Sequence, residues 1–255
     1  MNDRTDDLDV PAEKAIYVVD MRKYSKLQES QMESVRTDLD ALLATAFTES
    51  RIAADRVELD TGDGAIFILP PTQMWRLIDP LTANLDLALR RRAQARPADQ
   101  PDIAVRTSVH VGPLSDQNRG EAINHACRLV NSQTAYRTMS AAVEYGAHVG
   151  LTLSELAFRR TILAGRRLAL TETDFTEDRA QVTGKEDFDE RAFAHVPGLN
   201  GSALRRLAGF EPDPQPGAAT SAIDQSSPSS SGVHFHGGVG AVNGSVTELR
   251  QTNNF

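Results

Sequence analysis

The sequence predicts an α/β fold in which helices cover a sheet. Short apolar runs of strand length alternate with longer segments whose apolar residues recur every three to five positions. From residue 15 to residue 196 the order reads strand, helix, hairpin, helix, strand, helix, strand, helix, hairpin. Such alternation is typical of a sheet packed between helices.

The first elements follow from their periodicity. Residues 15–20 (AIYVVD) form a continuous apolar run, which predicts a buried strand. Residues 26–47 carry apolar side chains at helical spacing and predict an amphipathic helix with Ser25 as its N-cap. Residues 56–71 hold two apolar segments around a turn rich in Asp and Gly and end in two prolines. This pattern predicts a β-hairpin.

The middle of the chain continues the alternation. Residues 73–95 predict a helix that bends or breaks near Pro80, because proline lacks the backbone donor. Residues 103–112 alternate apolar and polar side chains, which predicts a strand. We expect residues 120–136 to form one helix.

The last elements close the predicted fold. Residues 147–163 predict a short strand and then a helix, with Ser154 as the helix cap. Residues 178–196 predict a closing hairpin.

Composition divides the chain into four parts. We expect a flexible N-terminus at 1–13, one domain at 14–210, a Pro/Ser-rich linker at 211–232 and a short tail motif at 233–255. The linker has too few large apolar groups to offset its ordering entropy, so we expect disorder. The tail regains weak alternation and is either disordered or adds a strand to a partner.

Charge and apolar content exclude several classes of function. A net charge of -8 argues against a general nucleic-acid or anionic-membrane surface, and we interpret the run Arg90, Arg91, Arg92 as a solvated helix end rather than a binding patch. No apolar run approaches the ~20 residues of a membrane span, and the polar start is unlike a signal peptide. With Cys127 as the single cysteine, these features predict a cytoplasmic protein.

Two aspartates stand where apolar strands meet turns. Asp20 ends the first predicted strand, and Asp63 lies in the hairpin turn. If the two strands are neighbours, both carboxylates lie at one end of the sheet, where such a pair can bind hard divalent cations. For either aspartate alone, a structural role in capping or turn formation is the more common explanation.

A helix pair adds a second group of candidates. Asn124 and Arg128 are four residues apart, so they share one face of the predicted helix. Arginine stabilises charge on a transferring phosphoryl group, and an amide can orient a sugar oxygen. Taken alone, an exposed structural pair is the better interpretation.

Together these segments resemble the class III nucleotidyl cyclases, the adenylate and guanylate cyclase family, over residues 14–198. The resemblance implies that family's ferredoxin-like α+β sandwich. Five motifs carry it in order: Asp20 to Ser25 (DMRKYS), Gly62-Asp63, Arg106 to Gly112 (RTSVHVG, with Ser108 in place of a glycine), Ile123 to Arg128 (INHACR), and VTGKEDF with Lys185.

The resemblance implies a role for each matched residue. Two Mn²⁺ or Mg²⁺ ions per site would be held by Asp20, Asp63 and the backbone carbonyl of Met21. Asn124 would orient the ribose, Arg128 would stabilise the transition state, and Lys185 would hold the distal phosphates of a nucleoside triphosphate. Backbone amides around Tyr24 and Ser25 would take triphosphate oxygens. A homodimer with its active sites at the subunit interface is also implied.

Two positions depart from the purine cyclases. Leu59 stands where those enzymes carry Lys or Glu, and Gln117 stands where they carry Asp or Cys. The chain therefore looks most like the bacterial Pycsar pyrimidine cyclases, which act in antiphage defence through a separate effector that senses the cyclic nucleotide. We expect UTP as substrate and cyclic UMP as product. A cytidylate or purine cyclase, and a non-catalytic nucleotide-binding module, remain the alternatives.

Overall fold

The computed structural model describes residues 11–53, 55–57, 62–165 and 169–210, with the backbone alone at 55–57. The expected linker, the expected tail motif and Leu59 lie outside these residues.

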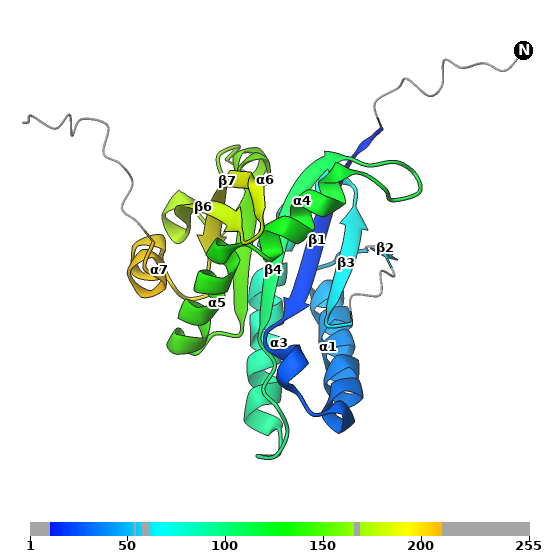
Figure 1. The fold of residues 1–255 in the computed structure, drawn as a ribbon, viewed down its shortest axis with the longest axis vertical. Coiled ribbons are helices and arrows are strands. Elements are labelled where there is room, and N and C mark those ends of the chain that lie inside the picture. The colour runs from blue at the N-terminus through cyan, green and yellow to red at the C-terminus, as the bar shows by residue number, and fades with distance from the viewer. Residues whose placement is uncertain (1–10, 54, 58–61, 166–168, 211–255) are drawn as a thin grey trace, which may run out of the picture. The chain divides into compact units, whose positions relative to one another are not determined.

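Seven strands of the described residues form one mixed sheet in the order β2-β3-β1-β4-β5-β7-β6 (Figure 1). Strand β1 is antiparallel to both of its neighbours, β3 and β4; β4 and β5 run parallel, and β6 and β7 form an antiparallel hairpin. Both predicted hairpins are confirmed. The strands are β1 (Glu13–Met21), β2 (Asp55–Val57), β3 (Gly64–Leu69), β4 (Val105–Pro113), β5 (Val149–Ser154), β6 (Thr176–Val182) and β7 (Lys185–His195).

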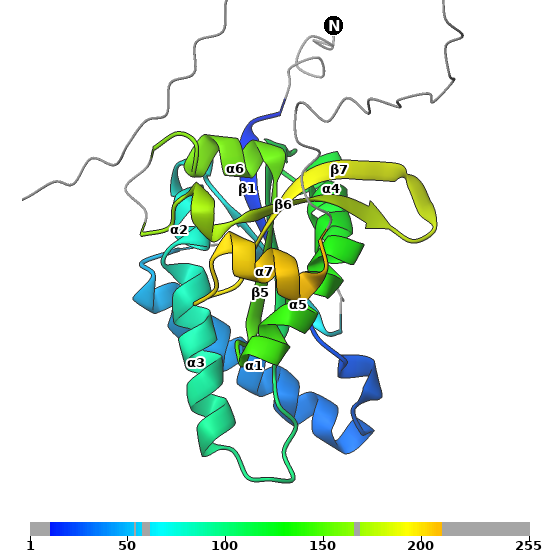
Figure 2. The same ribbon diagram turned by 90° about the vertical axis from the view of Figure 1, so that its left-hand side faces the viewer.

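Helices cover both faces of the sheet, as predicted (Figures 1 and 2). The larger core lies between the sheet and α1, α2, α3 and α6, while α4, α5 and α7 pack on the opposite face. The helices are α1 (Glu29–Glu49), α2 (Met74–Ile78), α3 (Leu81–Ala95), α4 (Glu121–Val130), α5 (Gln133–Tyr145), α6 (Glu155–Thr161) and α7 (Gly201–Ala208); 3-10 turns span Tyr24–Lys26, Pro71–Gln73 and Glu172–Asp174.

Alternation along β1 assigns its side chains to the two faces. Tyr17 and Val19 join the larger core, and Ile16 and Val18 pack under α4. Because successive residues of a strand point to opposite faces, the Asp20 side chain lies on the α4 face.

Two helix predictions need correction, and one helix was not predicted. The expected single helix at 120–136 is two helices, because Ser132 begins a new one: its hydroxyl accepts the Ala135 N–H at 3.2 Å. Ser25 is not the cap of α1. It lies in the 3-10 turn, and α1 begins at Glu29 with Gln28 in a capping box. Helix α7 was not predicted, because its amphipathic pattern lasts only two turns.

Two other local predictions are confirmed. The helix at 73–95 is broken at Pro80 into α2 and α3, and the Ser154 hydroxyl caps α6 by accepting the Ala157 N–H at 3.3 Å. The run Arg90, Arg91, Arg92 is solvated only in part: Arg91 is exposed, whereas Arg92 is 12% exposed and pairs with Asp38 of α1. Arg90 pairs with Asp86 of its own helix. Among the described helices, none combines the length and apolar character of a membrane span.

Close packing fixes α4 and α5 on the sheet. The buried Ser108 hydroxyl on β4 donates to the Ala126 carbonyl of α4 at 2.8 Å. On β5, a Cβ added at Gly150 would come within 3.2 Å of the Met139 backbone of α5, so this helix approaches to a distance that only glycine accommodates comfortably. These contacts hold the two helices that border the candidate site.

Candidate functional site

Asp20 and Asp63 lie together at one end of the sheet. The β1–β3 register places Asp20 opposite Gly64, and the Met21 N–H donates to the Asp63 carbonyl at 3.0 Å. The predicted juxtaposition of the two strand ends is therefore confirmed. The negative charge of Asp63 also raises the pKa of Asp20, so the two carboxylates interact.

Arg106 joins this pair from the other side of β1. It lies opposite Asp20 in the β1–β4 register, and its guanidinium forms an ion pair with the Asp20 carboxylate. Both side chains are largely buried, with 8% of Arg106 and 14% of Asp20 exposed. On its other side, the guanidinium stacks on the Tyr136 ring at 3.9 Å from the ring centroid. A buried arginine thus contacts both a proposed metal ligand and an aromatic face.

Burial dominates the electrostatics of Asp20. It raises the pKa of the carboxyl to about 6; Arg106 opposes this rise and Asp63 adds to it. A divalent cation between the two carboxylates would favour the charged form of both.

A cleft of about 400 Å³ opens beside the carboxylates. Its wall includes both Tyr24 and Ser25, two of the predicted substrate-binding residues, on the 3-10 turn that follows β1. Cationic and aromatic groups complete the lining: Arg22, Lys23, Lys26, Arg106 and Tyr136. A cleft lined by the Asp63 carboxylate and several cations, with Asp20 close beside it, suits a polyanion that carries metal ions.

The other predicted residues form a second group. The Asn124 amide donates to Glu121 at 3.3 Å, and Arg128 forms an ion pair with Asp187 on β7 at 3.5 Å. Lys185 begins that same strand and is exposed. None of the three predicted residues is among the described residues that line the cleft.

Helix α4 nevertheless lies beside the first group. Ile123 and Ala126 of this helix pack with Val18 of β1 in one apolar cluster, and Cys127 packs against the same cluster. Burial and the charge of Asp20 raise the pKa of the Cys127 thiol. Asp20 and Asp63 thus share the end of β1, and Arg128 pairs with Asp187 on β7, the strand that Lys185 begins.

The roles of Leu59 and Gln117 in selecting the nucleotide base stay predictions. Gln117 is exposed in the loop between β4 and α4 and does not line the cleft, while Leu59 lies outside the described residues.

Sequence reasoning missed the roles of Arg106 and Tyr136. Arg106 belonged to one of the matched motifs, but no function was assigned to it. A charged residue on a buried strand nevertheless indicates a polar partner. Tyr136 was placed at the end of the single helix expected at 120–136, which hid its orientation at the start of α5.

Solved structures identify the fold. Neither the protein-family models nor the curated proteins give a match to this chain. An adenylate/guanylate cyclase/hydrolase from Silicibacter pomeroyi is 18% identical, with a TM-score of 0.51 over 74% of this chain and 98% of that one. The chain has the fold of a nucleotidyl cyclase catalytic domain. A bacterial light-regulated adenylyl cyclase is also similar, at 13% identity and a TM-score of 0.51 over 77% of this chain and 58% of that one.

The donor set on this fold fits a hard divalent cation. The described residues contain no group of three or more His, Cys, Asp and Glu side chains that could hold a metal ion, so a cation at Asp20 and Asp63 would need further ligands from backbone carbonyls, water or the substrate. Two carboxylates with nearby backbone carbonyls are the oxygen ligands that Mg²⁺ and Mn²⁺ accept, with coordination positions left for phosphate oxygens.

Proposed function

We propose that this chain is a metal-dependent nucleotidyl cyclase that converts a nucleoside triphosphate to a cyclic nucleotide and pyrophosphate. The placement of Asp20 beside Asp63, at the end of a cation-lined cleft, carries this proposal. The cyclase fold supports it.

In the proposed reaction the ribose 3'-hydroxyl oxygen attacks the α-phosphorus. The bond from that phosphorus to the oxygen shared with the β-phosphate breaks, and the hydroxyl proton is lost. Asp20, Asp63 and the Met21 carbonyl would hold two Mg²⁺ or Mn²⁺ ions, which supply charge neutralisation and lower the pKa of the attacking hydroxyl.

The protein residues have separate duties in this scheme. Backbone amides around Tyr24 and Ser25 would bind triphosphate oxygens at the turn that opens toward α1. Asn124 would orient the ribose, Arg128 would stabilise the charge that develops at phosphorus, and Lys185 would hold the distal phosphates.

A homodimer would complete the site. Asp63 and Arg106 line the cleft, and Asp20 lies beside it in an ion pair with Arg106, whereas Asn124, Arg128 and Lys185 are not among its described lining residues. A second copy that presents its α4 and β7 to this cleft would join the two groups. We therefore place the active sites at the interface of a symmetric dimer.

The base is proposed to be a pyrimidine, with UTP converted to cyclic UMP. Leu59 and Gln117 replace the residues with which purine cyclases read their base, and loss of such hydrogen bonds removes strong discrimination. As in the bacterial systems that the sequence resembles, the product would signal phage infection to a separate effector. A cytidylate or purine cyclase remains the alternative within this class.

One observation favours a second candidate function. The Arg106 guanidinium already neutralises the negative charge of Asp20, one of the proposed metal ligands. Such a pair is expected in a module that binds a nucleotide without converting it to product.

Pyrophosphate release tests the proposal and separates it from this alternative. Each of the four triphosphates is incubated with Mn²⁺ and the purified chain. Wild type and the matched control Asp99→Asn, an exposed aspartate away from the cleft, should both release pyrophosphate, and Asp63→Asn should not. Tight triphosphate binding in calorimetry without pyrophosphate release would favour the non-catalytic module.

A further inference from the structure

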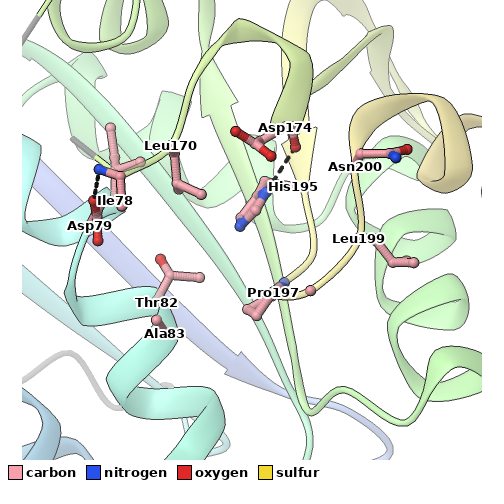
Figure 3. Close-up of a pocket in the computed structure, with 12 residues that line it drawn as sticks. Ile78, Asp79, Thr82, Ala83, Leu170, Asp174, His195, Pro197, Leu199 and Asn200 are labelled. Atoms are coloured by element: carbon pink, nitrogen blue, oxygen red, sulfur yellow. Dashed lines mark hydrogen bonds between the residues drawn. The ribbon is translucent and has the colours of Figure 1, made fainter.

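A second cavity, of about 430 Å³, shares no lining residue with the Asp20 cleft. Helices α2 and α3 border it on one side, and the end of β7 with the loop into α7 borders it on the other (Figure 3). Its volume is in the range of small-molecule sites.

A buried histidine faces this cavity. Only 4% of His195 is exposed, and its Nδ1 lies 2.8 Å from the Asp174 carbonyl oxygen. A carbonyl oxygen only accepts, so Nδ1 carries the proton and Nε2 holds a lone pair. Burial lowers the pKa of His195, which keeps the ring neutral.

The free acceptor of this ring is turned into the cavity. Figure 3 shows Nε2 directed away from Asp174, toward the space between Leu170, Thr82 and Pro197. Among the described residues, the structure shows no hydrogen-bond partner for Nε2. This nitrogen is therefore an acceptor open to the cavity, where a donor from outside the chain can reach it.

The two charged groups of the wall are also acceptors, while the Thr82 hydroxyl already donates to the Leu77 carbonyl and the Asn200 amide supplies the one side-chain donor among the other described lining residues. One oxygen of Asp79 accepts the Ala169 N–H at 2.6 Å, and one oxygen of Asp174 accepts the Thr171 N–H at 2.7 Å, so each carboxylate keeps a second oxygen. None of the described lining residues is Lys or Arg. Apolar groups form the rest of the wall: Ile78, Ala83, Leu170, Pro197 and Leu199.

We propose that this cavity binds a small organic cation, an ammonium or amidinium group on an apolar body. The apolar walls would take the body, and the N–H donors would meet His195 Nε2 and the carboxylates of Asp79 and Asp174. The carboxylates would repel a phosphate, so the site is distinct from the nucleotide cleft and does not depend on the proposed cyclase activity.

Calorimetry with the full chain tests this site, using tryptamine, phenethylamine and benzamidine as probes. At least one should bind with a Kd of about 1 mM or tighter, as expected for ligands of this size. Binding should shift the ¹⁵N resonance of His195 Nε2, and indole-3-acetate, the anionic counterpart of tryptamine, should bind at least about tenfold more weakly.

Two substitutions locate the binding. Ala83 lies on the exposed part of the wall, so Ala83→Phe should fill the cavity and weaken binding about tenfold or more while the fold is kept. The control Ala95→Phe changes an exposed alanine of the same helix outside the cavity and should bind as wild type does. Asp79→Asn should weaken binding, since it removes the charge but keeps an oxygen for Ala169.

Three results would overturn the proposal: no binding of any of the three cations at about 10 mM, equal binding of indole-3-acetate and tryptamine, or undiminished binding to Ala83→Phe.

Discussion

Arg106 lies directly across the β1–β4 pair from Asp20, and the two side chains form a largely buried ion pair. Asp20 therefore has a structural partner in addition to its proposed duty as a metal ligand. No such buried cation pairs with the Asp63 side chain among the described contacts. The two aspartates, equivalent in the proposed chemistry, should differ in what they contribute to stability.

Substitution by asparagine separates these duties. Asp20→Asn should lower the free energy of unfolding by roughly 1–3 kcal/mol, because it leaves the Arg106 guanidinium buried without its counter-charge. Asp63→Asn should change it by less than about 0.5 kcal/mol. Urea unfolding in the presence of a chelator measures both values, and equal losses in the two variants would contradict the structural role of the ion pair.

Mixing two inactive variants tests the proposed dimer. Asp63→Asn removes a proposed metal ligand from the part of the site that one subunit supplies. Asn124→Ala removes the proposed ribose contact from the part that the other subunit supplies. In a heterodimer of the two variants, one interface site combines both intact parts. Random pairing of co-expressed subunits should therefore restore roughly one quarter of wild-type activity.

The same pair of variants provides the control. Each variant purified alone should be inactive. If co-expression restores no activity, although tags on the two subunits show that heterodimers form, the active site does not lie between subunits.

Stability should fall in mild acid because of His110. Its ring stacks on His125 at 4.0 Å between centroids, and burial, followed by the charge of His125, lowers the pKa of His110 to about 3. In the unfolded chain His110 takes up this proton near 6.5, the ordinary pKa of histidine. The contribution of neutral His110 to the free energy of unfolding is thus complete above pH ~6.5. It is lost progressively as pH falls toward the pKa of His110 in the folded chain.

Urea unfolding at two pH values measures this effect. Between pH ~7.5 and pH ~5, His110 should account for about 2 kcal/mol of the loss. His110→Gln should lower stability at both pH values and reduce the loss on acidification by about this amount. His125 and the buried His195, whose pKa values are also lowered, should keep part of the slope in the variant. An unchanged slope would show that His110 titrates normally in the folded chain.

Local patterns predicted most of the fold. The apolar run that ends in Asp20 is the buried β1, and the pairing of β2 with β3 around Asp63 followed from ordinary hairpin rules. The pairing of β1 with β3 was only a condition of the metal-site prediction, because the two strands are not consecutive in the chain. The boundary between α4 and α5 could not be predicted from the sequence pattern, because the apolar spacing continues through Ser132. Only the hydrogen bond from the Ala135 N–H to the Ser132 hydroxyl marks the break. Helix α7 is short and depends on packing against α5 and β6 for its stability.

The site was predictable only in part, for a physical reason. Asp20 and Asp63 stand at strand ends, which a sequence pattern can indicate. The contact of Asp20 with Arg106 depends on the register between strands 86 residues apart, and the stacking of Arg106 on Tyr136 depends on how α5 lies on the sheet. Neither relationship has a local signal.

The most direct test of the cyclase proposal is chromatographic identification of the product from an equimolar pool of ATP, GTP, CTP and UTP with Mn²⁺. Wild type should produce a cyclic nucleotide, predominantly cyclic UMP, and Asp63→Asn should produce none. A purine product would overturn the base assignment. The absence of any cyclic nucleotide from wild type would contradict the proposed activity itself.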